Sequence, residues 1–313
     1  MALNRIGIVI HQPTAAAILR TIVDAEAAGV SNVWLTTGAG ADALTVFAAA
    51  ASKTQSVTMG TAIVPTFPRH PLVVAQQTAD IAQLAPNRFV LGLGPSHAAV
   101  MEGRYGIAYQ QPLSHLREFV TVVKALLSGT QADFEGEHFK VHAKLDYGAQ
   151  VQVVTSALRA PAFALAGELS EGAVTWLCPP AYLRDTALPA LERGATRQGR
   201  ARPKLIAHAF VALTSDPVEL QQGVTEFLQR YPRLTNYQEM FAAAGYPEAR
   251  QGAWSAGMVE AVVLHGTDDQ CSKKLESFIR TSGCDEIILS MMLVGADRDG
   301  ALRRTLQWAG AQR

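Results

Sequence analysis

Short apolar runs alternate with helix-length amphipathic segments along this chain, and this alternation limits its fold more than any other feature. Four runs near the start have the length and composition of buried strands: Arg5–Ile10, Asn32–Thr36, Val57–Ile63 and Arg88–Leu93. The segments between them predict helices at Thr14–Ala28, Asp42–Ser52 and Pro71–Leu84. Because strands joined by helices form right-handed units, this part of the chain predicts a parallel sheet.

The same alternation continues to the end of the chain. Four further strands are expected at Val151–Thr155, Ala173–Leu177, Leu205–Leu213 and Glu286–Ser290. Further helices are expected at Leu113–Leu127, Ala160–Glu168, Pro179–Gly194, Gln270–Thr281 and Arg298–Ala309, with a small hairpin at Phe134–Phe139. Eight strand–helix units over 313 residues are typical of a (β/α)8 TIM barrel, an α/β fold. The rival doubly wound sheet needs a Gly-x-Gly-x-x-Gly turn after its first strand, and His11-Gln12-Pro13 is not one.

One segment interrupts the regular alternation. Residues 216–265 contain helical stretches, Glu219–Arg230 and Tyr237–Ala244, and are rich in Gln, Tyr and Pro. We interpret this segment as a helical insertion that covers the barrel before the last helix–strand unit. Thr267 or Asp268 is expected to cap the helix that follows it. No low-complexity linker divides the sequence, so residues 1–313 are expected to form a single domain.

Composition argues against several classes of function. Twenty-seven basic residues balance 27 acidic ones, and no basic run is interleaved with aromatic residues. Neither nucleic acid nor a membrane is therefore expected as a partner. The three cysteines, Cys178, Cys271 and Cys284, are odd in number and form no Cys-x-x-Cys pair, which is typical of a reducing compartment. No signal-peptide pattern is found, and no apolar run approaches the roughly 18 residues of a membrane span. We expect a cytoplasmic protein.

In a TIM barrel the active site lies at the C-terminal ends of the strands, called here the mouth. The candidate residues directly follow the expected strands: His11, Thr36–Gly40, Ala62–Arg69, Gly92–His97, Thr155–Arg159, Thr175–Pro179 and Ser290–Met292. These segments hold few carboxylates and no set of ligands spaced for zinc, so no metal site is expected. They also lack a Gly-x-Ser-x-Gly elbow and a Walker loop. A mouth with few ionisable groups suits an organic cofactor that carries the reaction.

The stretch Met59–Pro71 is the most unusual of these segments. It begins as a strand and ends with Pro65, Pro68 and Pro71. Each proline fixes its own φ and disfavours the helical region for the residue before it. The stretch is either a stiff connection between strand and helix or a device that places backbone at the mouth.

Five segments carry a resemblance to a known family: Gly60–Pro71, Ala75–Gln77, Arg88–His97, Leu165–Trp176 and Gly266–Asp269. They resemble the luciferase-like monooxygenase superfamily. Within it, the chain is most similar to oxidoreductases that depend on the deazaflavin coenzyme F-420. The resemblance covers essentially the whole chain and implies a bacterial-luciferase-like TIM barrel with a flavin or deazaflavin across the mouth. It also implies that strand three ends in a bulge with a non-prolyl cis peptide, here Ala62–Ile63, against the ring.

The resemblance further implies which residues bind the cofactor. In the family the phosphate is held by backbone N–H groups after strand five and by residues of strand six. The corresponding residues here are Ser156, Ala157, Leu158, Arg159, Thr175 and Trp176. The other expected cofactor contacts are Thr36, Thr61, Ala62, Ile63, Val64, Gly94 and Ser96. Backbone amides at the start of a helix are a ready site for phosphate.

Two positions depart from the family pattern. Relatives commonly have Gly-Pro where this chain has Arg159-Ala160, so Arg159 either adds a charged phosphate contact or blocks the usual close approach. Relatives that oxidise alcohols or sugars carry an Asp-His pair where this chain has Thr37-Gly38. Alcohol oxidation thereby loses its proton acceptor. Reduction of an activated double bond or imine is favoured instead, or a dehydrogenase that uses another base.

Two histidines are candidates for the missing catalytic group. His97 lies on the loop after strand four, and His11 follows strand one. His70 lies at the start of an expected helix. It is expected either near the phosphate and tail of the cofactor or behind the residues that contact the cofactor. Tyr231 and Trp254 in the insertion are weaker candidates for substrate contact.

The resemblance implies a hydride-transferring oxidoreductase that uses coenzyme F-420 and a small organic substrate. The alternatives are an FMN-dependent monooxygenase of the same fold and a non-catalytic barrel that has lost cofactor binding. A homodimer is usual for the family and is the expected assembly. The sequence does not identify the substrate.

Overall fold

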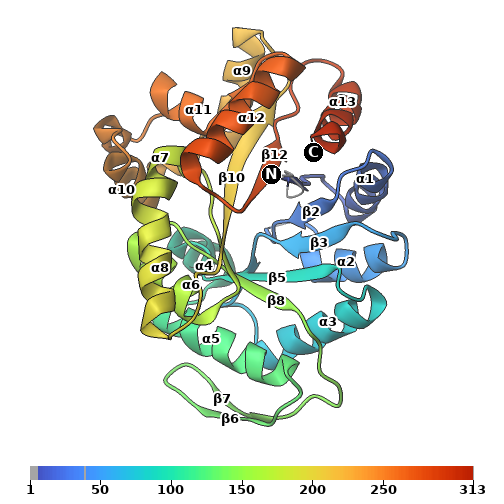
Figure 1. Cartoon of the computed structure of the whole chain (residues 1–313), viewed down its shortest axis with the longest axis vertical. Helices are drawn as coiled ribbons and strands as arrows, with labels where there is room; N and C mark the ends of the chain where they lie inside the picture. The colour runs from blue at the N-terminus through green and yellow to red at the C-terminus, as the bar shows by residue number, and fades with distance from the viewer. Residues whose placement is uncertain (1–5, 39, 313) are drawn as a thin grey trace.

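Parallel strands close into a barrel at the centre of the molecule (Figure 1). The computed structural model describes residues 6–38 and 40–312. Arg5 and Ala39, expected in the first strand and in the loop after the second, lie outside the described residues. Within these ranges the ring consists of β1 Ile6–Val9, β2 Asn32–Leu35, β3 Thr58–Thr61, β5 Phe89–Gly94, β8 Gln152–Ser156, β9 Gly172–Val174, β10 Lys204–Ala212 and β12 Glu286–Met291. Pairing of β1 with β12 closes the ring, which confirms the expected TIM barrel.

Helices between the strands form the outer layer (Figure 1). They are α1 Ala15–Ala27, α2 Ala43–Ala51, α3 Pro71–Leu84, α5 Pro112–Leu127, α6 Ala160–Leu169, α8 Leu188–Arg197, α12 Asp268–Ser282 and α13 Arg298–Ala311. The expected caps are confirmed: the Asp42 side chain accepts from the Thr45 N–H, and Thr267 forms a capping box with Gln270. The helix expected at Pro179–Gly194 is confirmed and runs on to Arg197: the short α7 Pro180–Tyr182 and a π-helical turn Leu183–Ala187 lead directly into α8. One element of this layer was not expected, α4 Ala98–Tyr105. None of the helices within the described ranges is both long and apolar enough to cross a membrane.

The helical insertion lies between β10 and α12, as expected. It consists of α9 Pro217–Gly223, a π-helical turn Val224–Leu228, a 3-10 turn Tyr231–Arg233, α10 Thr235–Ala243, a second 3-10 turn Pro247–Gln251 and α11 Ala256–Val262. It ends in a short strand that was not expected, β11 Val263–His265, which pairs with β10. A surface hairpin of β6 Ala132–Glu135 and β7 Lys140–Ala143 projects at the lower edge of Figure 1 and confirms the expected hairpin.

Trp34 fills the interior of the barrel. Its indole is 3% exposed and packs in an inner cluster with Val9, Ala62, Val154, Val174, Ile206 and Ile288. The strands on either side present glycines to it: a Cβ at Gly7 would lie 2.8 Å from the indole, and one at Gly60 would lie 2.6 Å from it. Glycine at both positions therefore gives the ring the room that it needs.

Glu26 on α1 fixes the entry to β3. Its carboxylate accepts hydrogen bonds from the N–H groups of Gln55, Ser56 and Val57 and from the Ser56 hydroxyl. Burial alone would raise the pKa of this carboxyl, but the hydrogen bonds outweigh that effect and hold its pKa below the ordinary value of 4.5.

Glu26→Gln is expected to lower the free energy of unfolding by about 1–2 kcal/mol at pH 7. Because the folded-state pKa is lowered, the stabilisation is fully present above the ordinary carboxyl pKa and is lost as pH falls through the folded pKa. The variant should therefore lose less stability on acidification than the wild type. Urea titrations at several pH values measure this, with Asp24→Asn, an exposed change on the same helix, as the control. Parallel pH curves for wild type and Glu26→Gln would contradict it.

Candidate active site

Strand β3 is interrupted at the mouth. It stops at Thr61, not at Ile63 as expected, and pairing with β5 resumes at β4, Val64–Pro65, where Val64 lies opposite Leu93. The peptide bond between Ala62 and Ile63 is cis, as the family resemblance implied. We call residues 62–63 the β3–β4 break. The break places backbone at the C-terminal end of the barrel. This is the second of the two interpretations of Met59–Pro71, a device that places backbone at the mouth.

Thr61 bridges the break with its side chain. Its hydroxyl donates to the Gly92 carbonyl at 2.8 Å and accepts from the Gly92 N–H at 2.7 Å. Thr61 is fully buried, and these bonds replace the backbone pairing that the break removes. The Thr61 hydroxyl is thus used to join β3 to β5. Any contact between Thr61 and a cofactor would have to come from the Thr61 backbone.

Ile63, Gly94 and Ser156 come together beside the break, and we call these three residues the cradle. A Cβ at Gly94 would lie 2.2 Å from Ser156 Oγ and 3.0 Å from Ile63 Cγ1. The Ile63 carbonyl accepts from the Thr37 N–H at 3.3 Å, which joins the cradle to the end of β2. Three other residues that were expected to contact the cofactor lie near these positions in the chain. Thr36 at the end of β2 is half-buried, Val64 is buried, and Ser96 adopts φ 62° on the loop after β5. The structure thus brings expected cofactor residues from three strands to one place.

The segment expected to hold the phosphate starts α6. Arg159 is the N-cap residue, and its exposed side chain makes no capping bond. The Ala157 N–H is used within the barrel, where it donates to Val174 O. The N–H groups at positions 158–160 have no hydrogen-bond partner in the described part of the chain. These three groups are therefore the amides that can meet an anion.

Two hydroxyl groups near the mouth lack partners. Thr37 Oγ1 and Thr175 Oγ1 are buried, and neither makes a hydrogen bond within the described ranges. The Cys178 thiol lies close to the Thr175 side chain; burial raises the pKa of Cys178, and this contact lowers it by a smaller amount. The Thr175 N–H is already used by Ile206 O, so its hydroxyl is the group free to bind a ligand. Unpaired buried hydroxyls are costly, which favours a ligand at both positions.

Three adjacent strands place a histidine cluster at the mouth. His208 Nε2 on β10 lies 2.8 Å from Ser290 Oγ on β12, and Ser290 Oγ lies 3.2 Å from Nε2 of His11, which follows β1. Trp176 stacks on His208 with ring centroids 3.6 Å apart and an interplanar angle of 10°. Strand β9 ends at Val174, before the expected end at Leu177, so Trp176 leaves the sheet to reach this position.

The insertion contacts this cluster through a tyrosine. Tyr231 OH accepts from Trp176 Nε1 at 2.8 Å and from Arg230 at 2.9 Å. The Tyr231 ring packs against Tyr237, which in turn meets His97 with ring centroids 5.9 Å apart. Tyr231 is therefore at the mouth, as expected for a lid residue. Trp254 packs inside the insertion, where its indole N–H donates to Leu228 O.

Both expected catalytic histidines are uncharged at neutral pH. His11 is exposed, but many protein atoms surround its ring. Burial by these atoms, and then the charge of Arg230, lower the pKa of His11 to about 4. Burial and then Arg230 also lower the pKa of His97, which is half-buried and caps α4 without a side-chain bond. Burial and then His11 lower the pKa of His208 well below its ordinary range. Among the described residues no carboxylate contributes to these three pKa shifts, so the mouth favours negative charge on a ligand.

His208 and Arg230 were not among the expected site residues. His208 is the single imidazole in the otherwise apolar strand Leu205–Leu213, and this contrast could have identified it. Arg230 lies in the insertion, where no sequence pattern places it at the mouth. His70 caps α3 by accepting from the Leu72 N–H, and it is exposed.

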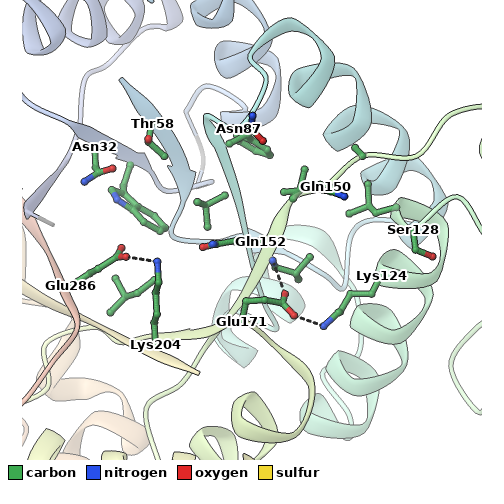
Figure 2. A pocket seen from close by; sticks show the side chains of 18 residues that line it. Asn32, Thr58, Asn87, Lys124, Ser128, Gln150, Gln152, Glu171, Lys204 and Glu286 are labelled. Atoms are coloured by element: carbon green, nitrogen blue, oxygen red, sulfur yellow. Dashed lines mark hydrogen bonds and ion pairs between the residues drawn. The ribbon is translucent and has the colours of Figure 1, made fainter. Parts of the chain in front are cut away.

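A cavity of about 720 Å³ opens at the other end of the barrel (Figure 2). Its lining includes the first residues of six strands: Asn32, Thr58, Phe89, Gln152, Lys204 and Glu286. Lys204 pairs with Glu286, and Lys124 with Glu171, as the dashed lines in Figure 2 show. Catalytic residues of TIM barrels lie at the C-terminal ends of the strands, so we assign the chemistry to the mouth and not to this cavity.

This chain resembles known proteins along most of its length. Residues 1–286 match the profile of luciferase-like monooxygenases. The 5,10-methylenetetrahydromethanopterin reductase of Methanolobus tindarius is 26% identical over 195 residues, which are 61% of this chain and 59% of that protein. An F420-dependent glucose-6-phosphate dehydrogenase of Nakamurella multipartita is 32% identical over 165 residues, 50% of this chain and 48% of that protein. The matches thus span about half of these relatives.

A solved structure has the same fold. It is an F420-dependent secondary alcohol dehydrogenase in complex with an F420-acetone adduct, and it superposes with a TM-score of 0.85 at 19% identity over 100% of both chains. At that identity the likeness shows the fold alone. The family profile, in contrast, matches most of the sequence. This chain therefore belongs to the luciferase-like monooxygenase family.

Proposed function

We propose that this protein is an oxidoreductase that transfers a hydride between coenzyme F-420 and a small organic substrate at the mouth. The observation that carries the proposal is the cradle, where the absence of a side chain at Gly94 lets Ile63 and Ser156 meet the end of β5 beside the β3–β4 break; a Cβ at Gly94 would lie 2.2 Å from Ser156 Oγ. The name of the F420-dependent dehydrogenase among the sequence relatives supports F-420 as the cofactor. A cytoplasmic homodimer is part of the proposal: the compartment rests on the three cysteines of the sequence, and the dimer rests on the family resemblance.

The residues present fit a deazaflavin. The cradle would hold the ring system, and the free N–H groups at 158–160 with the Thr175 hydroxyl would hold the phosphate. The exposed Arg159 can add a charged contact there without a change in the backbone. When bound, a deazaflavin supplies a carbon that gives or accepts a hydride and does not activate oxygen.

The chain's own side chains favour reduction of a polarised double bond. His11 and His97 are neutral and can donate hydrogen bonds, and Arg230 adds the positive charge that acts on both. A carbon–oxygen or carbon–nitrogen double bond, or a carbon–carbon bond conjugated to a carbonyl, gains negative charge as it accepts a hydride. Groups of this kind stabilise that charge. The lid contact between Tyr231 and Trp176 limits the access of water to the site.

Equilibrium titration of the purified protein tests the cofactor assignment. We expect F-420 to bind with a dissociation constant at least about tenfold below that of FMN, measured by the change in cofactor fluorescence. Tight binding of FMN alone, with turnover that consumes oxygen, would show a monooxygenase instead. Binding of neither cofactor at high concentration would show a barrel that has lost this function.

A further inference from the structure

A chain of hydrogen bonds at the mouth determines where the protons of two histidines lie. It begins at the Leu177 N–H, which lies 3.3 Å from His208 Nδ1. A backbone N–H can only donate, so His208 Nδ1 must be the unprotonated acceptor. His208 is fully buried and uncharged. A neutral imidazole carries one proton, so the proton of His208 is on Nε2.

Ser290 passes this arrangement to His11. The His208 Nε2–H donates to Ser290 Oγ at 2.8 Å. Ser290 is 0% exposed, and His11 Nε2 at 3.2 Å is the other polar partner of its hydroxyl within the described residues. The Ser290 O–H therefore donates to His11 Nε2. Since His11 is also neutral, its own proton is on Nδ1.

The three residues are held by the barrel itself. Ser290 lies opposite Val9 on β1 and opposite Phe210 on β10, so β12 stands between the strands that carry the two histidines. Trp176 stacks on His208 and limits rotation of its ring. Adjacent strands thus fix the positions of His208 and Ser290, and the Leu177 N–H on the loop after β9 sets which nitrogen of His208 accepts.

The free end of this chain of bonds is a donor at the mouth. His11 Nδ1 has no hydrogen-bond partner within residues 6–38 and 40–312, and the ring is exposed. Its basic lone pair, on Nε2, is already occupied by Ser290. The charged or titratable groups that act on His11 are Arg230 and His208, and neither is an anion that would favour the imidazolium form.

We propose that His208 and Ser290 are positioning residues that hold His11 as the neutral Nδ1–H tautomer, so that His11 donates a hydrogen bond to a substrate oxygen and does not act as a general base. The substrate part of this inference rests on the proposed function; the tautomer part does not. Neutral imidazole donors stabilise an oxygen that gains negative charge in the reaction.

Nitrogen NMR of the full chain without cofactor tests the tautomers directly. Long-range ¹H–¹⁵N correlation spectra separate protonated from unprotonated ring nitrogens, and His11→Gln and His208→Gln assign the signals. We expect His11 protonated on Nδ1 and His208 protonated on Nε2 at pH 7. A His11 that is protonated on Nε2, or that carries both protons at pH 7, would overturn the proposal.

Variants test the role of Ser290. Ser290→Ala is expected to release His11 into a mixture of tautomers, so that the two ring nitrogens of His11 give averaged ¹⁵N shifts in place of one protonated and one unprotonated signal. Ser290→Cys, of similar size but with a weak donor, should be intermediate and guards against misfolding of the alanine variant. Thr66→Val is the matched control, because Thr66 Oγ1 lies 3.3 Å from His115 Nδ1 in a separate buried pair. It should change His115 signals alone.

The two parts of the inference fail separately. If F-420 does not bind but His11 is the Nδ1–H tautomer, the proposed function is wrong and the positioning role of His208 and Ser290 is kept. If F-420 binds and Ser290→Ala leaves the His11 spectrum unchanged, the positioning role is wrong and the cofactor assignment is kept.

Discussion

Gly92→Ala is expected to destabilise the protein by about 3–5 kcal/mol. A Cβ at Gly92 would lie 1.8 Å from the backbone oxygen of Thr61, so β3 and β5 would have to separate. That movement would also break the two hydrogen bonds between the Thr61 hydroxyl and the Gly92 backbone. Chemical denaturation followed by circular dichroism measures the loss.

The control for this substitution is Gly103→Ala. Gly103 lies on α4, and no atom of the described residues approaches a Cβ there within 4 Å, so alanine should be neutral or slightly stabilising. A Gly92→Ala variant that unfolds at the same denaturant concentration as Gly103→Ala would contradict the close approach of β3 to β5.

Gly94→Ala is expected to weaken F-420 binding by at least about tenfold, or about 1.4 kcal/mol. The new methyl group would occupy the cradle, 2.2 Å from Ser156 Oγ and 3.0 Å from Ile63 Cγ1. Ser156 can rotate away, so we expect a smaller loss of stability than for Gly92→Ala. Fluorescence titration of each variant with F-420 measures the affinity.

Gly103→Ala is again the control and should bind F-420 as the wild type does. The melting curve of Gly94→Ala must be recorded alongside, because a folded variant is needed to interpret its affinity. A folded Gly94→Ala protein with wild-type affinity would show that the cradle does not bind the cofactor.

The alternation of apolar runs and helices was enough to predict the barrel. Buried parallel strands are short continuous apolar runs, and the helices carry recognisable signals such as Asp42 and Thr267 at their starts. The short elements α4 and β11 were missed. Strand β11 is three residues long and is defined by its pairing with β10, which no local pattern reveals.

The positions of some candidate site residues could be predicted because chain order determines them. Residues at the end of a strand or just beyond it, such as Gly94 and His11, must lie at the mouth once the barrel closes. His208 was missed because its role depends on Ser290, which is 82 residues away in sequence and adjacent only through the pairing of β10 with β12. Arg230 was missed because its position depends on how the insertion packs.

A crystal structure of the protein with F-420 tests the central claim most directly. We expect the tricyclic ring against Ile63 and Gly94, with the phosphate at the start of α6 near Ser156 and Arg159. A ring bound in the cavity beside Lys204 and Glu286, at the opposite end of the barrel, would contradict the claim.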